Sequence, residues 1–277
     1  MSEPPVRTGV TQEDRRGSPP LIKAMKSNRR LRLITGLLSA ILLISIASNY
    51  FLFSRGKQYY LRLNETRLHP LGLHYYSTNP NQRDHTDPER TTVVFFGDSR
   101  AAGWLSPNDF NQFEFINRGI GAQTSAQAIH RFDYHIRPLQ PQIIVVQVGI
   151  NDLKTIPLFP DRKEFIIDDC QENIRQIVGR ATDLDTIVIL TTIFPLGKVP
   201  IERRLFWSED VALAVDETNA YIRSLERENV IVLDAFSILA DEEGITRAEY
   251  SRDLLHINTS GYEALNDELT QVLTAFD

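Results

Sequence analysis

Two widely separated segments of the chain hold a serine and an acid–histidine pair. Gly97-Asp98-Ser99 follows a short apolar run, and a glycine turn there would present the serine hydroxyl at the end of a strand. Asp253 and His256 lie close together in a polar loop near the C-terminus, where a carboxylate can orient an imidazole as a general base. Each segment also has a plainer interpretation. Gly, Asp and Ser are common turn residues, and a histidine in a loop is usually a surface residue.

Two further segments would supply hydrogen-bond donors to a negative charge. Asn117-Arg118-Gly119-Ile120-Gly121-Ala122-Gln123-Thr124 opens a predicted helix, and its closely spaced glycines leave backbone N–H groups free to face an anion. It lacks the third glycine of the dinucleotide-binding fingerprint. Gly149-Ile150-Asn151-Asp152 ends another apolar run, and the Asn151 amide could donate a hydrogen bond into the same crevice. A simple helix-entry loop and a strand-end cap are the alternative interpretations of these two segments.

Five short apolar runs would position these segments. The runs are Val93–Phe96, Phe113–Ile116, Ile143–Val148, Ile187–Leu190 and Val230–Leu233. Nearly continuous apolar runs of this length are typical of parallel strands that are buried on both faces. Three of the four polar segments directly follow separate runs. In an open α/β sheet, ligands bind at the carboxyl ends of the strands, so we expect these segments to meet there.

Amphipathic helices are predicted between and after these runs. Their apolar faces are Ile129, Phe132 and Ile136; Ile167, Cys170, Ile174 and Ile177; Val211, Val215, Ile222 and Leu225; and Leu265, Leu269, Val272 and Phe276. We expect capping boxes at Thr124 with Gln127 and at Ser260 with Glu263. Strands that alternate with helices predict one doubly wound α/β domain with a five-stranded parallel sheet. Cys170, on an apolar face, is predicted to be a core residue and not a nucleophile.

In this order, the four segments resemble the motifs of the GDSL/SGNH hydrolase family of esterases and lipases. Gly97-Asp98-Ser99 resembles its nucleophile block, residues 117–124 its glycine block, residues 149–152 its Gly-x-Asn-Asp block and residues 253–256 its Asp-x-x-His block. The resemblance covers the chain from about Thr91 to the C-terminus. It implies a flavodoxin-like three-layer sandwich and a serine esterase that cleaves acyl esters without a cofactor.

The resemblance also implies roles for individual residues. Ser99 would be the nucleophile, His256 the general base and Asp253 the residue that orients the imidazole. The oxyanion hole would consist of the Ser99 N–H, an N–H of the Gly121–Ala122 segment and the Asn151 amide.

Ala122 departs from the family pattern, because family members often have two adjacent glycines here. The group that the chemistry uses is a backbone N–H, which alanine retains. We therefore expect the replacement Ala122→Gly to have little effect on activity and to lower stability slightly, since glycine has more freedom to lose on folding. The alternative is that the family geometry needs a positive φ here, in which case alanine is strained and glycine would relieve the strain.

Several functions would use these residues. A hydrolase would act on lipid or lysolipid esters or on O-acetylated polysaccharide, and an O-acyltransferase of cell-surface glycans would use the same site. An inactive binding module would be expected to lack Ser, Asp or His, and all three are present. The loop from Leu196 to Trp207 would either line the site or be solvated.

Charge and composition exclude other classes. The net charge of −6 argues against a general nucleic-acid binder, which needs a basic surface. One cysteine excludes an internal disulfide framework, and the six histidines form no cluster at ligand spacing. We therefore expect no protein-bound metal, and the family resemblance implies that no cofactor is needed.

The N-terminal region predicts a membrane anchor. Leu33–Phe53 has no charged residue and is about long enough to cross a hydrocarbon core of roughly 30 Å. Basic residues are more frequent before it than directly after it, which favours a cytoplasmic N-terminus: Lys23, Lys26, Arg29, Arg30 and Arg32 precede it, and Arg55 and Lys57 follow. A cleaved signal peptide is the alternative, because Ser45-Ile46-Ala47 is a small-x-small triplet. In both cases the rest of the chain lies outside the cytoplasm, anchored or secreted.

The sequence therefore divides into four predicted parts. These are a disordered cytoplasmic tail (1–32), a transmembrane anchor (33–53), a stalk or N-terminal extension (54–90) and an SGNH hydrolase domain (91–277).

Overall fold

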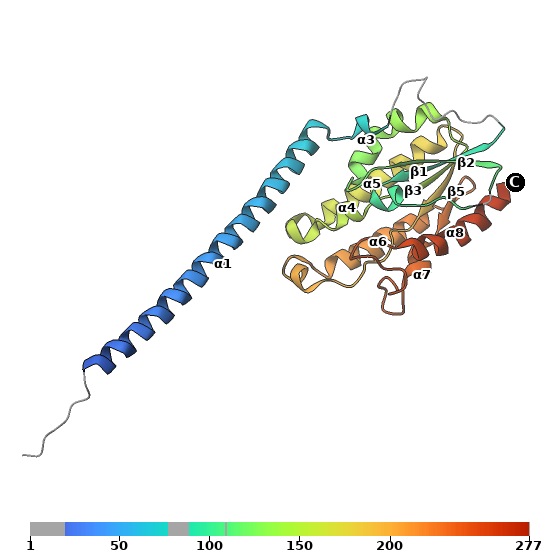
Figure 1. Ribbon diagram of the computed structural model, residues 1–277. Helices are drawn as coiled ribbons and strands as arrows, with labels where there is room; N and C mark the ends of the chain where they lie inside the picture. The colour runs from blue at the N-terminus through green and yellow to red at the C-terminus, as the bar shows by residue number, and fades with distance from the viewer. Residues whose placement is uncertain (1–19, 77–88, 109, 277) are drawn as a thin grey trace, which may run out of the picture. The chain divides into compact units, whose positions relative to one another are not determined.

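The computed structural model describes residues 20–76, 89–108 and 110–276, with residues 20–28 described by their backbone alone. Two compact units divide between Asn64 and Glu65. The first unit contains most of one long helix, α1 (Pro20–Leu68), and the second is an α/β domain (Figure 1).

The α/β domain is built on a sheet of five parallel strands in the order β2-β1-β3-β4-β5 (Figure 1). The strands are β1 (Thr91–Gly97), β2 (Phe113–Gly119), β3 (Ile143–Gln147), β4 (Ile187–Thr191) and β5 (Val230–Leu233). Each predicted apolar run forms one strand. In this flavodoxin-like order the chain changes direction across the sheet between β1 and β3, which is where ligands bind in such folds. The predicted doubly wound fold is confirmed.

Helices cover both faces of the sheet. The longer ones are α3 (Ser125–His135), α5 (Lys163–Thr182), α6 (Asp210–Ser224) and α8 (Thr259–Leu273). The shorter ones are α2 (Ser99–Ala102), α4 (Ile150–Leu153) and α7 (Ala235–Leu239), with 3₁₀ helices η1 (Leu73–Tyr75), η2 (Arg137–Leu139), η3 (Ile156–Leu158), η4 (Pro160–Arg162), η5 (Ile201–Phe206) and η6 (Thr274–Phe276).

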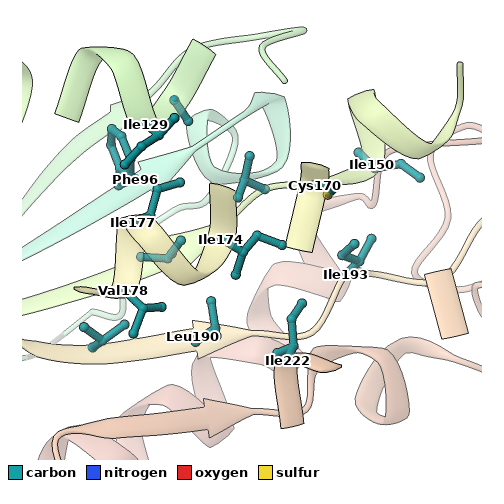
Figure 2. Packing of buried hydrophobic residues seen from close by; sticks show 14 of the residues in the cluster. Phe96, Ile129, Ile150, Cys170, Ile174, Ile177, Val178, Leu190, Ile193 and Ile222 are labelled. Atoms are coloured by element: carbon teal, nitrogen blue, oxygen red, sulfur yellow. The ribbon is translucent and has the colours of Figure 1, made fainter. Parts of the chain in front are cut away.

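Alternate residues of β1 enter two separate cores. Val94 and Phe96 pack with the apolar faces of α3, α5 and α6 on one side of the sheet, as Figure 2 shows for part of this cluster. Phe95 packs with α7 and α8 on the other side. Cys170 is fully buried in the first core, and burial raises the pKa of its thiol well above the usual value. Its prediction as a core residue is confirmed.

One of the two predicted helix caps is wrong. Thr124 and Gln127 form the expected capping box at the start of α3. At α8, however, Asn258 is the cap, and its Oδ1 accepts a hydrogen bond of 3.1 Å from the Gly261 N–H. Ser260 lies inside the first turn of that helix, because the chain becomes helical two residues earlier than expected.

The N-terminal helix is longer than the apolar run that predicted it. It begins at Pro20, a favourable first helical residue, and ends two residues before Pro70, which is incompatible with a helix interior. Residues 20–32, expected to be unstructured, and residues 54–68, expected to belong to a stalk, are therefore helical. By length and composition the helix fits a membrane span, and a signal sequence would pass the same test. Residues 1–19 and 77–88 of the predicted tail and stalk lie outside the described residues.

The segment after α1 packs on the α/β domain. The carbonyl oxygen of Leu71 accepts a hydrogen bond of 2.9 Å from the Gln123 amide, and that of Pro70 accepts one of 2.6 Å from Gln127. The Tyr76 hydroxyl donates to the Gly119 carbonyl at 2.6 Å. This part of the predicted 54–90 segment is therefore an extension of the domain.

Candidate active site

The turn after β1 holds Ser99 at the carboxyl edge of the sheet. Gly97 has a φ of 150°, and a Cβ at this position would lie 1.7 Å from the Gln147 carbonyl oxygen, so only glycine fits. Asp98 then caps the short helix α2, because its Oδ1 accepts a hydrogen bond of 2.8 Å from the Arg100 N–H. Ser99 becomes the first residue of this helix and is half-buried.

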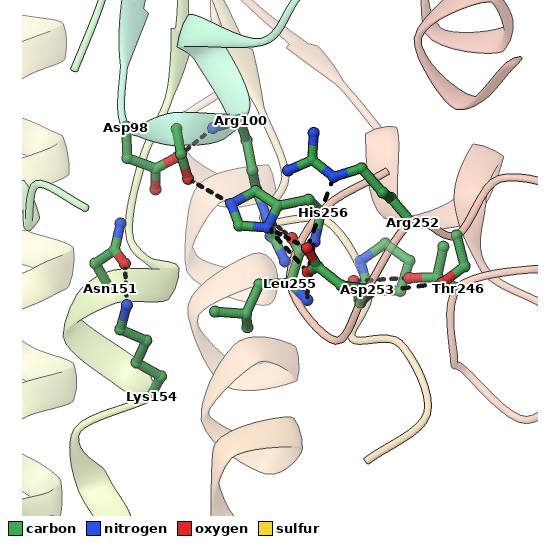
Figure 3. Close-up of polar contacts among 12 residues, drawn as sticks. Asp98, Arg100, Asn151, Lys154, Thr246, Arg252, Asp253, Leu255 and His256 are labelled. Atoms are coloured by element: carbon green, nitrogen blue, oxygen red, sulfur yellow. Dashed lines mark hydrogen bonds and ion pairs between the residues drawn. The ribbon is translucent and has the colours of Figure 1, made fainter. Parts of the chain in front are cut away.

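His256 lies beside Ser99, although 157 positions separate them in the chain. Ser99 Oγ and His256 Nε2 are 2.9 Å apart. On the other side of the ring, Nδ1 lies 2.9 and 3.0 Å from the two carboxylate oxygens of Asp253 (Figure 3). The structure thus brings together a hydroxyl, an imidazole and a carboxylate in one hydrogen-bonded row.

The Asp253 carboxylate is half exposed and is held as an anion. Burial alone would raise its pKa, but hydrogen bonds from the backbone N–H groups of Leu255 and His256 and from the imidazole outweigh burial and lower this pKa below its usual value. Because an ionised carboxylate only accepts hydrogen bonds, we assign the imidazole proton to Nδ1. Nε2 is then free to accept the proton of the Ser99 hydroxyl.

The glycine block faces the serine. A Cβ on Gly121 would lie 3.9 Å from the Ser99 Cβ. Ala122, the next residue, has a φ of 64°, in the left-handed region that alanine rarely adopts. The backbone N–H groups of Ser99, Gly121 and Ala122 donate no hydrogen bond to another described residue. They are therefore available to a ligand.

Asn151 joins the ends of β2 and β3. It is 4% exposed, and its Nδ2 donates a hydrogen bond of 3.0 Å to the Gln123 carbonyl oxygen. Its Oδ1 accepts a hydrogen bond from the Lys154 ammonium group (Figure 3). Because lysine can only donate, this contact fixes which end of the amide carries the NH₂ group. One hydrogen of that group is used by Gln123, and the second remains for a ligand.

Lys154 was missed by the sequence analysis. The pKa of its ammonium group is lowered, mainly by burial. The nearby Asp98 carboxylate opposes this shift, and the Arg203 guanidinium adds to it. The spacing contained a usable signal. A residue three positions after Asn151 faces it if the segment is helical, as residues 150–153 are.

Arg100 was also missed, and it connects the serine turn to the histidine loop. Its side chain is fully buried, with Nε 2.7 Å from the Leu255 carbonyl oxygen and Nη1 3.0 Å from that of Phe194. Burial lowers its pKa to about 10, so the guanidinium remains a cation at neutral pH. An arginine directly after the serine gave no periodic signal, because its partners are backbone atoms far away in the sequence.

A second buried arginine supports the glycine block. Arg131 donates from Nε to the Gln123 side-chain oxygen and, over 2.9 Å, from Nη2 to the Gly97 carbonyl. Burial lowers its pKa to about 9. The sequence did contain a signal here, since Arg131 lies three residues after Ala128 and four before His135, on the buried face of α3.

The loop from Leu196 to Trp207 reaches the Asn151 side of the site. Its helix η5 has only exposed side chains, and Arg203 lies close enough to Lys154 for its charge to lower the lysine pKa. In the described part of the chain, no group of three His, Cys, Asp or Glu side chains is arranged to hold a metal ion. No residue is therefore assigned to one.

A protein-family model matches the sequence of the α/β domain. The model of the GDSL-like lipase/acylhydrolase family matches residues 95–264, which include all four segments singled out above. No curated protein matches the chain.

Solved structures share the fold. A GDSL-like lipase from Bacteroides thetaiotaomicron VPI-5482 aligns with a TM-score of 0.61 and 22% identity, over 75% of this chain and 99% of that one. The acetyl xylan esterase AlAXEase aligns with a TM-score of 0.53 and 20% identity, over 65% and 98%. The lipase Lip_vut3 from a goat rumen metagenome aligns with a TM-score of 0.51 and 15% identity, over 65% and 96%. At these identities the likeness shows the fold alone.

Proposed function

The chain belongs to the GDSL-like lipase/acylhydrolase family and is an ester hydrolase, and we propose that Ser99, His256 and Asp253 are its catalytic triad. The observation that carries the proposal is the row of contacts from Ser99 Oγ to His256 Nε2 at 2.9 Å and from Nδ1 to both oxygens of Asp253. This is the arrangement in which an imidazole can accept the serine proton while a carboxylate stabilises the resulting cation.

The chemistry proceeds in two halves. Ser99 Oγ attacks the ester carbonyl carbon as His256 Nε2 takes the hydroxyl proton, and the carbonyl π electrons move onto oxygen. When the tetrahedral intermediate collapses, the C–O bond to the alcohol breaks and His256 gives its proton to the leaving oxygen. Water then attacks the acyl-serine with the same base, which releases the carboxylic acid and restores Ser99.

The negative oxygen of each intermediate is stabilised by three donors. These are the backbone N–H of Ser99, an N–H of the Gly121–Ala122 segment and the Asn151 amide. The proposal is supported by the proximity of Gly121 to Ser99 and by the absence of other described acceptors for these backbone groups. Lys154 and Arg100 are positioning residues, because the first orients the Asn151 amide and the second holds the backbone next to His256.

We further propose where the enzyme lies and what it cleaves. Residues 33–53 anchor the chain in a membrane, residues 1–32 face the cytoplasm, and the hydrolase domain at 91–277 lies on the other side, connected by residues 54–90. The substrates are then esters found outside the cytoplasm, either lipid or lysolipid esters or O-acetyl groups on polysaccharide. One structural neighbour is named an acetyl xylan esterase, and this name supports polysaccharide acetyl groups as one of the two proposed substrate classes.

The test uses the full chain in detergent with p-nitrophenyl acetate, butyrate and octanoate. Ser99→Ala and His256→Ala should each lower kcat by at least about 10⁴-fold, and the double variant should be hardly worse, because nucleophile and base act as one unit. The exposed residues Ser106 and His130 offer matched controls, and their alanine variants should keep full activity. Independent, multiplicative losses in folded protein would refute the shared triad. Product analysis with added alcohol shows whether the acyl group passes to water or to an acceptor.

A further inference from the structure

Exposed apolar side chains of the α/β domain are concentrated in one part of the chain. Between residues 89 and 276, nine large apolar side chains of the described residues are exposed, and seven of them fall within residues 158–213. Three belong to the segment from η3 to α5, namely Leu158, Phe159 and Phe165. Four belong to η5 and α6, namely Ile201, Leu205, Phe206 and Leu213. We call these seven the apolar rim.

The two segments of the rim are adjacent in space. η3 packs against α6 and also against η4, which leads into α5. Lys163, the first residue of α5, forms an ion pair of 2.8 Å with Asp210, the first residue of α6. The starts of α5 and α6 are thus held side by side, and only three residues separate η5 from α6, so the two segments of the rim lie on the same side of the domain.

This surface lies at the catalytic edge of the sheet. η3 follows the carboxyl end of β3 and η5 follows that of β4, and parallel strands end at the same edge. The Arg203 charge on η5 acts on Lys154, whose ammonium group contacts Asn151. The rim therefore adjoins the proposed oxyanion hole.

We propose that the apolar rim docks onto the surface of a lipid bilayer. Isolated exposed apolar side chains are ordinary, but a concentration of aromatic and aliphatic side chains on one edge marks an interaction surface. A bilayer interface accepts such side chains, with neighbouring polar groups remaining in the headgroup region. Acidic and basic residues are mixed in both rim segments, for example Asp161 with Arg162 and Glu202 with Arg203. Docking therefore depends on apolar contact and not on anionic lipid.

Two further observations favour a bilayer over a protein partner. The same chain carries α1, a helix apolar and long enough to span a membrane, and only residues 69–90 connect it to β1. A short tether raises the effective concentration of the tethered surface at the bilayer without any new contact. In addition, an apolar pocket of about 550 Å³ opens beside the rim, lined by residues that include Val199, Trp207 and Ala212. It offers room for part of a lipid chain.

The test measures lipid contact in the full chain reconstituted in phosphatidylcholine vesicles. Leu205→Cys and, separately, Phe159→Cys are labelled with an environment-sensitive fluorophore, and Cys170 does not compete because it is fully buried. The control is Glu228→Cys, an exposed position just before β5 and hence at the opposite edge of the sheet. Vesicle lipids that carry a nitroxide on the acyl chain should quench both rim probes at least about threefold more than the control probe.

Other results would overturn the proposal. Equal quenching at all three positions means that the rim does not reach the bilayer. Rim probes that are shielded from an aqueous quencher but not quenched by nitroxide lipid are covered by protein, either a second copy or another partner. Flotation of the full chain with vesicles tests whether α1 holds the protein on the membrane. A chain that does not float would overturn the proposal. The Ser99→Ala background should give the same quenching, so docking is judged independently of the proposed triad.

Discussion

Lys154 carries a positive charge next to Asn151, one of the proposed oxyanion-hole donors. Its ammonium group contacts Asn151 Oδ1, and the Asn151 NH₂ group contacts the Gln123 carbonyl. Without the ammonium group, the amide loses one of the two contacts that distinguish its oxygen from its nitrogen, and only the Gln123 carbonyl still orients it. The lysine acts through the asparagine, so the two residues should not contribute independently.

Kinetics on three variants test this coupling. Asn151→Ala should lower kcat by about 10²–10³-fold, the usual loss for one oxyanion donor, with a smaller change in KM. Lys154→Met should lower kcat by roughly tenfold, and the double variant should match Asn151→Ala alone, because residues in one network are not additive. An unchanged kcat for Asn151→Ala would mean that the residue only caps the end of β3, and additive losses would assign Lys154 a separate role.

Ala122 is strained by its backbone conformation. A φ of 64° costs an alanine roughly 1–2 kcal/mol, whereas glycine adopts it freely. This reverses the expectation from sequence that Ala122→Gly lowers stability, because relief of strain exceeds the added freedom of the unfolded chain, about 0.4–1 kcal/mol. The left-handed φ could not be read from the sequence, since alanine gives no signal for it.

Thermal unfolding and ester kinetics test the consequence. Ala122→Gly should raise Tm by roughly 1–3 °C and change kcat/KM by less than about tenfold, or 1.4 kcal/mol. Asp185→Gly is the matched control, because Asp185 also has a positive φ of 56° and lies in an exposed turn between α5 and β4. It should raise Tm without affecting kinetics. A large gain on octanoyl but not acetyl esters would show instead that the Ala122 methyl group limits acyl size.

At the scale of elements, the start of α8 decides how the His256 loop is held. Asn258 caps the helix and also donates a hydrogen bond of 2.7 Å from Nδ2 to the Glu249 carbonyl oxygen. Next to it, Ile257 pairs with Ser251, which closes the loop that contains Asp253 and His256. One residue thus joins the last helix to both ends of this loop.

Replacing that residue should destabilise the domain. Asn258→Ala should cost about 1–2 kcal/mol of unfolding free energy, the usual loss of an N-cap together with the second hydrogen bond. Ser260→Ala should change stability by less than about 0.5 kcal/mol, because Ser260 is exposed and caps nothing. Denaturant unfolding of the two variants shows which of the two residues caps α8. A larger loss for Ser260→Ala would restore the capping box expected from the sequence.

The five strands and the four longer helices of the α/β domain could be predicted from the sequence, and their ends could not. All five strands coincide with apolar runs, because strands buried on both faces have few polar positions. Asn258, Thr259 and Ser260 are all acceptable caps, so local preference does not select one. Asn258 is selected by its second contact, the hydrogen bond to the Glu249 carbonyl oxygen. Arg100 escaped notice for a similar reason, since its partners Leu255 and Phe194 lie far away in the sequence. Lys154 had a local signal, the three-residue spacing from Asn151, and it was overlooked.

At the scale of the whole molecule, the proposed topology rests on the helix α1 and on the charges that flank its apolar part. Hydropathy predicts Leu33–Phe53 as the part that crosses the membrane, but it does not predict the helix ends, because flanking residues without proline continue the helix to Leu68. Five basic residues directly precede the apolar run and two closely follow it, which favours a cytoplasmic N-terminus.

Protease added to intact cells tests this topology. We expect it to remove the domain after Phe53 and to spare an N-terminal tag, whereas both should be digested in lysed cells. A soluble mature form that begins near Ser48 would establish cleavage of a signal peptide instead.

Ser99 and His256 are separated by 157 positions in the chain, so the ribosome adds the histidine well after the serine. A ribosome that adds about 5–20 residues per second reaches the histidine codon on the order of 10–30 s after the serine codon. Throughout that interval the nascent chain carries the proposed nucleophile without its base. With the proposed triad, the chain is therefore latent during synthesis and becomes competent only after residue 256 has been added. A chain released after Leu233 but before residue 256 contains all five strands and, with the proposed triad, is still inert.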